Sequence, residues 1–220
     1  MSFPINCCSE RGNTLYFNQI IGDLMVHSRR VSKKCPVCRL FKSICVCGDI
    51  TKFNIKTRVT LLMHVKEVDR STNTGKIAEL MLENSKTVIV GAPDGKLEQS
   101  DIISEGYENV VLFPHASNIM DDSFISKLDR PLNLIVPDGN YHQAVKMTRS
   151  GLLSGIKRVR LPSGQKGEYG LRDSKDPEKV STIEAVIKAL EILGDIQAAE
   201  AMTDIFRKMV ERFKTHNGRL

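Results

Sequence analysis

The stretch LNLIVPDGNYHQAVKM, residues 132–147, decides the fold that we predict. Its apolar beginning has the length and the branched side chains of a buried strand, which a Pro-Asp-Gly sequence then ends. The residues after it show the spacing of apolar side chains that is typical of a helix. Asp138 and Gly139 therefore lie at the carboxyl end of a predicted parallel strand, where open α/β sheets bind ligands. An ordinary strand–turn–helix junction with Asp138 as the helix cap would have the same sequence.

The rest of the chain repeats this alternation of strand and helix. Further strands are predicted at residues 58–65, 87–90, 109–113 and 157–161, and helices at residues 76–82, 180–193 and 196–216. The alternation predicts an α/β fold, a mostly parallel sheet with covering helices, in a main domain of residues 55–220. Three of the predicted strands are followed by polar loops, at residues 114–118, 138–141 and 163–173. If these strands are neighbours in the sheet, the loops meet in one pocket.

Four cysteines lie close together near the amino terminus. Cys35 and Cys38 form a CxxC pair, and Cys45 and Cys47 form a CxC pair six residues later. Four thiolates at this spacing can surround Zn²⁺, and four protein ligands leave no open position, so we predict a structural zinc site in a small module of residues 1–54. Two disulfides, free thiols or a redox-active CxxC are the alternatives. The second pair and the expected cytoplasmic location argue against them.

Composition and charge indicate a protein that binds nucleic acid. The chain has 220 residues, enough for one full-sized domain and a small appendage, and a net charge of +6. Residues 27–58 hold nine Lys and Arg against one acid, whereas residues 94–129 hold eight acids against two lysines. A basic segment at the cysteines favours a polyanionic partner, although a basic surface without a partner is common. The sequence shows no membrane span and no secretory signal, so we expect a cytoplasmic protein with no membrane partner.

A second polar segment follows the predicted strand at residues 58–65. Asn73, Thr74 and Gly75 stand at the start of the next helix. Their side chains and backbone N–H groups could bind an anion or a carboxylate. A helix cap without any ligand would use the same residue types.

Four motifs in this order resemble the DTW-domain family of tRNA-uridine aminocarboxypropyltransferases. They are CxxC-x6-CxC, HxxExxRxxNTG, DGNYxxAxKM and YGLR followed by STIEA, and they extend over roughly residues 35–193. The family element Asp-Gly-Thr-Trp stands here as Asp138, Gly139, Asn140 and Tyr141, which keeps the carboxylate, a polar side chain and an aromatic ring. The resemblance implies a fold related to the SPOUT methyltransferases, with a knotted carboxyl-terminal region.

The resemblance also implies the reaction and its cofactor. The family transfers the 3-amino-3-carboxypropyl group of S-adenosylmethionine to N3 of a tRNA uridine, which leaves methylthioadenosine. Asp138 is the expected catalytic residue, as the general base that accepts the N3 proton. Side chains that hold the methionyl carboxylate would direct the γ-carbon, and not the methyl group, toward the nucleophile.

Further site residues follow from the same resemblance. The residues expected to bind the cofactor are Arg70, Asn73, Thr74, Gly75, Pro114, His115, Asp138, Gly139, Tyr169, Leu171, Arg172 and Ser181. The residues expected to bind the tRNA substrate are His64, Glu67, Tyr141, Arg29, Arg30, Lys33, Lys34 and Lys42. Within this second set, Tyr141 would stack on a base or on adenine, and the basic residues would contact phosphates.

Two other functions stay open at this point. A SPOUT-type RNA methyltransferase would use the same pocket but release S-adenosylhomocysteine. A zinc-containing RNA-binding protein without catalysis would bind tRNA but not the cofactor. The oligomeric state is also open, with a monomer favoured.

Overall fold

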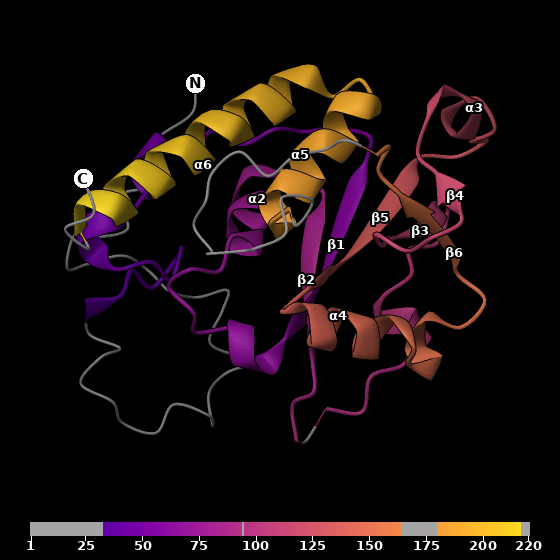
Figure 1. Cartoon of the computed structure of the whole chain (residues 1–220), viewed down its shortest axis with the longest axis horizontal. Coiled ribbons are helices and arrows are strands. Elements are labelled where there is room, and N and C mark those ends of the chain that lie inside the picture. The colour runs from indigo at the N-terminus through magenta and orange to yellow at the C-terminus, as the bar shows by residue number, and fades with distance from the viewer. Residues whose placement is uncertain (1–32, 94, 164–179, 217–220) are drawn as a thin grey trace.

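A parallel β-sheet forms the centre of the structure (Figure 1), a computed structural model that describes residues 33–93, 95–163 and 180–216. Within these residues the sheet has six strands in the order β2-β1-β5-β3-β6-β4, and every neighbouring pair is parallel. The strands are β1 (Arg58–His64), β2 (Ser85–Val90), β3 (Glu108–Leu112), β4 (Asn118–Ile119), β5 (Leu132–Asp138) and β6 (Lys157–Arg160). Asp138 thus ends a strand that lies between β1 and β3.

Helices cover both faces of the sheet (Figure 1). One face carries α2 (Gly75–Met81), α5 (Thr182–Ile192) and α6 (Ile196–His216), and the other carries α4 (Tyr141–Thr148). The short helix α3 (Asp122–Ile125) follows β4 at the edge of the sheet. The 3₁₀ turns are η2 (Lys42–Ile44), η3 (Cys47–Asp49), η4 (Val65–Glu67), η5 (Gln99–Asp101) and η6 (Gly151–Leu153).

The side chains of β5 alternate between two hydrophobic clusters. Leu134 and Val136 pack into the cluster that includes α2, α5 and α6, and Ile135 packs into the cluster on the α4 side. Because successive side chains of a strand point to opposite faces, Asp138 has the same orientation as Val136. The strand therefore directs this carboxylate toward α2 and α5.

The structure confirms the predicted α/β class, with a mostly parallel sheet and covering helices. All five predicted strands are present, and β5, β3 and β6 are neighbours, so their carboxyl ends lie along one edge of the sheet. The loops at residues 114–118 and 138–141 begin there, whereas residues 164–173 of the third predicted loop lie outside the described residues. Strand β4 was not predicted, because two exposed residues cannot show a periodic pattern. The knot stays a prediction, because residues 164–179, between β6 and α5, lie outside the described residues.

The cysteine module packs against the sheet domain through apolar side chains. Leu40, Ile44 and Val46 are buried in the same cluster as Met81 of α2 and Phe206 of α6. The division at residue 54 stays a prediction, but the hydrophobic core crosses it. The described part of the module and the sheet domain therefore share one core.

The longest described helix, α6, is amphipathic. Met202, Phe206 and Met209 recur at helical spacing and are buried on the side that faces the rest of the protein. None of the helices within the described ranges is both long enough and apolar enough to cross a lipid bilayer.

Candidate functional site

Asp138 lies at the centre of the candidate site and is 4% exposed. Asn73 Nδ2 donates a hydrogen bond to Asp138 Oδ2 at 2.6 Å, and Thr182 Oγ1 donates one to Asp138 Oδ1 at 2.6 Å. Hydrogen bonds to a carboxylate are short and about twice as strong as neutral ones. The carboxylate of β5 therefore joins the segment before α2 to the first residue of α5.

Each of the two segments that contact Asp138 begins a helix, and a side chain caps the first turn of each helix. Asn73 Oδ1 accepts a hydrogen bond from the backbone N–H of Lys76 at 3.0 Å in the first turn of α2. Ser181 and Glu184 form a reciprocal capping box at the start of α5. The backbone N–H of Ile183 also donates to Thr74 Oγ1 at 3.4 Å. The Asn-Thr-Gly sequence and the start of α5 thus form one continuous contact around the carboxylate.

Gly75 allows this close approach. A Cβ atom at this position would lie 2.8 Å from Asp138 Oδ2 and 3.0 Å from its Cγ. Any side chain here would have to displace the Asp138 carboxylate. The glycine of the HxxExxRxxNTG motif is therefore required by the packing of Asp138 onto α2.

On the other side of β5, His64 and Gln143 join the end of β1 to α4. His64 Nδ1 lies 3.2 Å from the backbone nitrogen of Lys66 and 3.2 Å from Gln143 Nε2. Because the backbone N–H can only donate, Nδ1 is an acceptor, and the neutral imidazole carries its proton on Nε2. Gln143 Oε1 in turn accepts from the backbone N–H of Asn140 at 2.6 Å.

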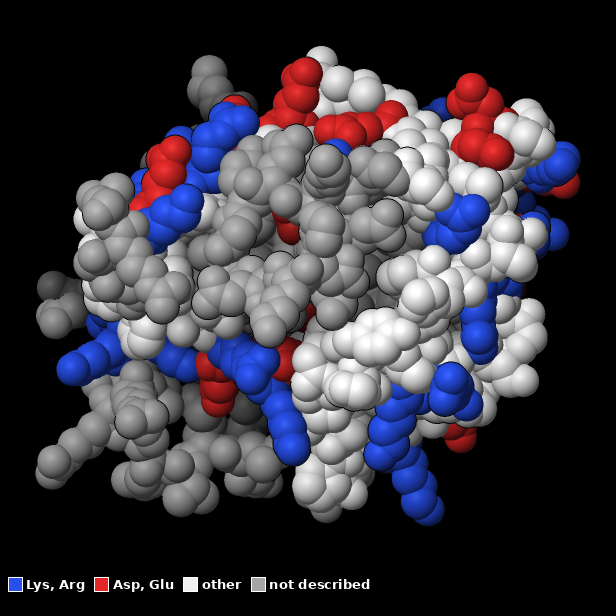
Figure 2. Space-filling model, in the orientation of Figure 1, with Lys and Arg blue, Asp and Glu red and all other residues white. Residues whose placement is uncertain are grey.

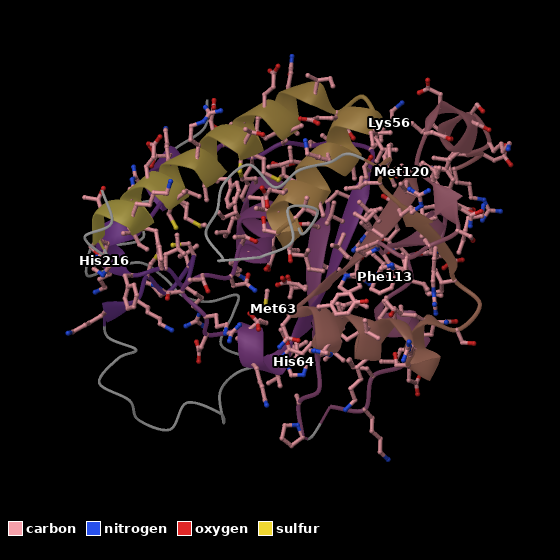
Figure 3. The ribbon with its side chains drawn as sticks, in the orientation of Figure 1. Lys56, Met63, His64, Phe113, Met120 and His216 are labelled. Carbon is pink, nitrogen blue, oxygen red and sulfur yellow. The ribbon has the colours of Figure 1, made fainter. Side chains whose placement is uncertain are left out.

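Tyr141 is the exposed aromatic residue of the site. Its side chain is 47% exposed, and its hydroxyl lies 2.9 Å from His115 Nε2, on the loop after β3. The rings of His115 and His142 make edge contacts with Tyr141 at centroid distances of 5.9 and 6.0 Å. His64, Phe113 and Met63 lie along this edge of the sheet (Figure 3). Three rings therefore form an aromatic cluster, Tyr141, His115 and His142, in which Tyr141 and His142 follow Asp138 closely in sequence and His115 comes from the loop after β3.

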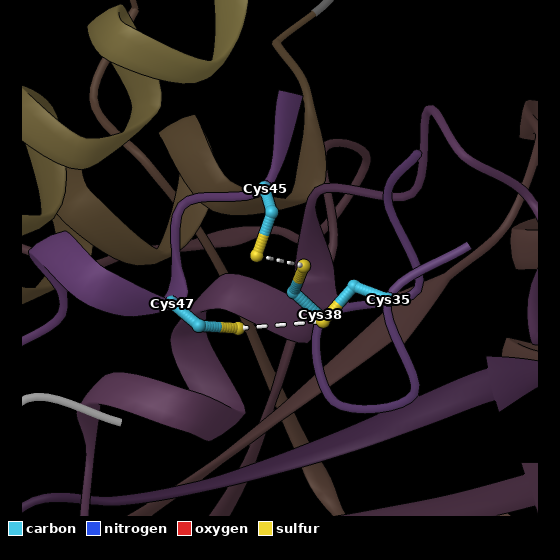
Figure 4. Close-up of side chains that lie close together, drawn as sticks. All are labelled: Cys35, Cys38, Cys45 and Cys47. Atoms are coloured by element: carbon cyan, nitrogen blue, oxygen red, sulfur yellow. Dashed lines mark hydrogen bonds between the residues drawn. The ribbon is translucent and has the colours of Figure 1, made fainter. Parts of the chain in front are cut away.

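The four cysteine sulfurs of the amino-terminal module converge on one point (Figure 4). The Sγ atoms of Cys35 and Cys47 are 3.8 Å apart, those of Cys38 and Cys45 are 3.7 Å apart, and all four lie within 4.8 Å of one another. A tetrahedral Zn²⁺ with bonds of about 2.3 Å places its sulfurs about 3.8 Å apart. The donor set and its spacing fit a structural zinc ion.

Crowding of the thiols favours metal binding as well. Hydrogen bonds from neighbouring thiols, first of all Cys38, hold the pKa of Cys35 well below its usual range. The Cys35 thiolate accepts a hydrogen bond from the Cys47 thiol and so raises the pKa of Cys47. The pKa of Cys45 lies below its usual value as well, whereas the pKa of Cys38 lies above it. Two sulfurs of the cluster are thus readily ionised, whereas ionising the other two without a cation is opposed. A divalent cation at the centre would remove this conflict by neutralising the thiolates.

Comparison with known proteins identifies the family. The DTW domain matches residues 32–214, which include the four cysteines, Asp138 and the start of α5. The chain belongs to the DTW domain family. Among solved structures it is similar to the SAM-dependent rRNA:acp-transferase Tsr3 from Vulcanisaeta distributa, with 20% sequence identity, a TM-score of 0.43, and coverage of 74% of this chain and 85% of that one.

Within this DTW domain, Glu67 and Arg70 form a separate pair. Glu67 is 1% exposed and accepts a hydrogen bond from Arg70 Nη1 at 2.9 Å, while the Arg70 side chain is 53% exposed. The buried Glu67 therefore fixes the guanidinium and is itself withdrawn from solvent. Arg70 remains open to a ligand, whereas Glu67 serves to hold it.

The other expected site residues fall into three groups. Pro114 and His115 are exposed on the loop after β3, and Gly139 packs against Gln143, whose Oε1 atom would lie 2.9 Å from an added Cβ. Lys33 and Lys42 are exposed, whereas Lys34 donates to the backbone carbonyl of Asp69. Five further expected residues, Arg29, Arg30, Tyr169, Leu171 and Arg172, lie outside the described residues.

Two residues that matter in this DTW domain were not singled out from the sequence. Thr182 bonds directly to Asp138, although the prediction favoured its neighbour Ser181, which caps α5. Gln143 links His64 to α4. Both could have been suspected from their positions, because Thr182 follows the cap residue of a helix and Gln143 stands three residues after Asn140, where a capping box places its partner.

Proposed function

We propose that this protein is an S-adenosylmethionine-dependent aminocarboxypropyltransferase that modifies N3 of a tRNA uridine. Membership of the DTW domain family over residues 32–214 is the observation that carries the proposal. The buried Asp138 at the carboxyl end of β5, held by Asn73 and Thr182, supports it, because ligands of open α/β sheets bind at that edge.

The acceptor chemistry requires a proton to leave N3 of the uracil. A carboxylate offers about four lone-pair positions, and Asn73 and Thr182 each use one position on a different oxygen of Asp138. We assign the general base to Asp138, whose carboxylate the two donors hold in a fixed orientation. A base held in this way needs little reorganisation when the nucleophile arrives.

S-adenosylmethionine would supply the electrophilic carbon of the 3-amino-3-carboxypropyl group. We place its methionyl carboxylate beside the half-exposed Arg70 and the turn at Asn73 and Thr74. Arg70 suits this position because Glu67 fixes the guanidinium while leaving half of the side chain open. The zinc ion that fits the four cysteines has no open coordination position, so its role would be structural.

The direct test is a reaction of the purified protein with S-adenosylmethionine and unmodified tRNA. We expect methylthioadenosine and a tRNA uridine enlarged by the aminocarboxypropyl group, both measured by mass spectrometry. Unmodified rRNA in a parallel reaction tests the choice of substrate. Release of S-adenosylhomocysteine would assign methyl transfer instead, and binding of tRNA without any turnover of the cofactor would leave a non-catalytic RNA-binding protein.

The role of Asp138 is tested by comparing Asp138→Asn with Thr182→Val. Loss of a general base lowers kcat by about 10²–10⁴-fold. We expect that loss in Asp138→Asn with little change in the dissociation constant of S-adenosylmethionine, measured by calorimetry. Thr182→Val keeps the carboxylate and should lower kcat less. Equal losses of cofactor binding in both variants would show that Asp138 acts only by positioning α2 and α5.

A further inference from the structure

The segment that follows Asp138 has an unusual charge. Residues 139–163 contain Lys146, Arg149, Lys157, Arg158 and Arg160 and not one Asp or Glu, although acids make up 26 of the 220 residues of the chain. This segment comprises α4 and η6, which lie on the opposite face of the sheet from α2 and α5, and the strand β6 of the sheet itself. Figure 2 shows Lys and Arg side chains gathered on the lower right of the molecule, where Figure 1 places α4 and the chain after it.

Two of these five cations, Lys146 and Arg149, differ from the other three in their contacts. Lys157 pairs with Glu108 at 3.4 Å, Arg158 donates to the backbone carbonyl of Thr148 at 2.6 Å, and Arg160 donates to Leu161 and Ser163. Lys146 and Arg149 are exposed, and within the described part of the chain neither has an ion-pair partner. Their charges therefore remain available to an anion from outside the protein.

Lys146 and Arg149 share one face of α4 with His142. The three residues are spaced by four and three positions, which brings them to the same side of a helix. Together with Val145 and Ser150 they line an open, shallow hollow of the protein surface, not an enclosed cavity. The hollow combines an imidazole, an apolar side chain and two cations that have no ion-pair partner among the described residues, and this combination suits a phosphate with an attached nucleoside.

The same helix connects the hollow to the candidate active site. Tyr141 begins α4 only three residues after Asp138, and its exposed ring contacts the rings of His115 and His142. Exposed aromatic rings beside cations are the usual means of holding single-stranded RNA, because bases stack on the rings while phosphates meet the charges. From Tyr141 to Arg149 the helix rises about 12 Å, the length of a short RNA segment.

We propose that the α4 face, formed by Tyr141, His142, Lys146 and Arg149, binds the single-stranded RNA next to the modified uridine. The bases stack on the aromatic cluster, and the phosphates lie at Lys146 and Arg149. This surface is separate from the basic residues of the cysteine module and rests on the proposed function, because it takes the RNA substrate of that reaction. The proposed RNA contact also explains why α4, which begins three residues after the last residue of β5, carries exposed cations.

The test measures RNA affinity against salt concentration for Lys146→Glu/Arg149→Glu. The probe is an unmodified, fluorescently labelled tRNA transcript. We expect the affinity at 0.1 M salt to fall about ten-fold or more, and the slope of log K against log[salt] to become shallower by about two, one for each lost phosphate contact. The neutral pair Lys146→Gln/Arg149→Gln should give the same change of slope with a smaller loss of affinity. Tyr141→Ala should weaken binding about ten-fold.

The matched control is Lys127→Glu/Arg130→Glu. These two residues are exposed, carry the same charges, and precede β5 at the opposite edge of the sheet from Asp138. The control reverses the same total charge, so we expect less than a two-fold change in affinity. An equal loss in the control pair, or an unchanged salt slope in the α4 pair, would overturn the inference.

The outcomes also separate this inference from the proposed function. Transfer to tRNA by the unaltered protein, together with unchanged RNA affinity of the α4 pair, overturns the RNA surface alone. Reduced RNA affinity of the α4 pair, with no transfer by the unaltered protein, overturns the reaction and supports the surface. Failure of the unaltered protein to bind RNA overturns both. Circular dichroism and calorimetry of S-adenosylmethionine binding check that each variant is folded.

Discussion

At the scale of single residues, Asp138 can occupy its position because Gly75, which packs against it, has no side chain. The carboxylate lies against the Cα of Gly75, and Asn73 and Thr182 fix its two oxygens. A buried carboxylate without donors would be strongly destabilising, so these partners stabilise the fold and orient the group at once. Substitution of an uncharged residue around Asp138 is therefore expected to disturb the site, even when every charged residue is kept.

Gly75→Ala is predicted to lower activity sharply without removing a functional group. The added Cβ would lie 2.8 Å from Asp138 Oδ2, so the carboxylate must move and its bonds to Asn73 and Thr182 lengthen. We expect a loss of stability of about 1–3 kcal/mol and a fall in kcat/KM of about 100-fold. Urea unfolding and the transfer assay measure the two effects.

The control for this variant is Gly151→Ala, since no atom lies within 4 Å of a Cβ at that glycine. Its stability should change by less than about 0.5 kcal/mol, as at an ordinary surface position. If Gly75→Ala were as active as Gly151→Ala, the position of the Asp138 carboxylate would not matter for the reaction.

The sequence predicted site roles for Asp138, Asn73 and the cysteines, but not the hydrogen bonds that hold Asp138. Thr182 is 44 positions from Asp138, and Gln143 is 79 positions from His64. Contacts over such distances depend on strand order, and a single sequence shows only local periodicity. The carboxylate could be found from its place after a strand, whereas its donors required the fold.

At the scale of elements, α6 holds the cysteine module in place. Arg212 donates to the backbone carbonyl of Cys45 and to Asp49 Oδ2 at 2.8 Å, and Lys208 lies 3.2 Å from Asp49 Oδ1. His216 stacks on Phe41 at a centroid distance of 5.4 Å. The spacing of apolar residues predicted α6, and the spacing of the cysteines predicted the module, but the contact between them could not be seen in the sequence.

Arg212→Met is predicted to loosen this contact. The variant keeps a helix-forming residue but removes the donor to the Cys45 carbonyl and to Asp49 Oδ2, while Lys208 still contacts Asp49 Oδ1. We expect a loss of about 1–3 kcal/mol in unfolding free energy and faster hydrogen exchange in η2, η3 and the end of α6.

Lys214→Met on the same helix serves as the control, because Lys214 is exposed and has no ion pair among the described residues. Its effect should stay below about 0.5 kcal/mol. Equal exchange rates in the two variants would show that Arg212 does not anchor the module.

At the scale of the whole molecule, one hydrophobic core spans the sequence-predicted boundary at residue 54. Cys35 and Val46 are fully buried in the same cluster as Val59 of β1 and Met202 of α6. The fold class and the four-cysteine cluster follow from patterns within short segments, which is why the sequence predicts them. A shared core depends on packing between segments and becomes visible only in the structure.

Removal of zinc is therefore predicted to destabilise the entire protein in one step. We expect a chelator, or Cys35→Ser, to lower the free energy of unfolding by on the order of 3 kcal/mol or more. Calorimetry should show a single transition at a lower temperature, because the module and the sheet share their core. A small separate transition that disappears with zinc, while the main one stays unchanged, would contradict this.

The contact between α6 and the cysteine module also bears on how the protein is made. Arg212 follows Cys45 by 167 residues. At typical rates of translation, the ribosome needs on the order of ten seconds to add that length of chain. During this interval the nascent cysteines lack the helix that later packs against their module, so a metal ion could bind the thiolates before this contact forms. Maturation of the module then ends only when the last helix leaves the exit tunnel.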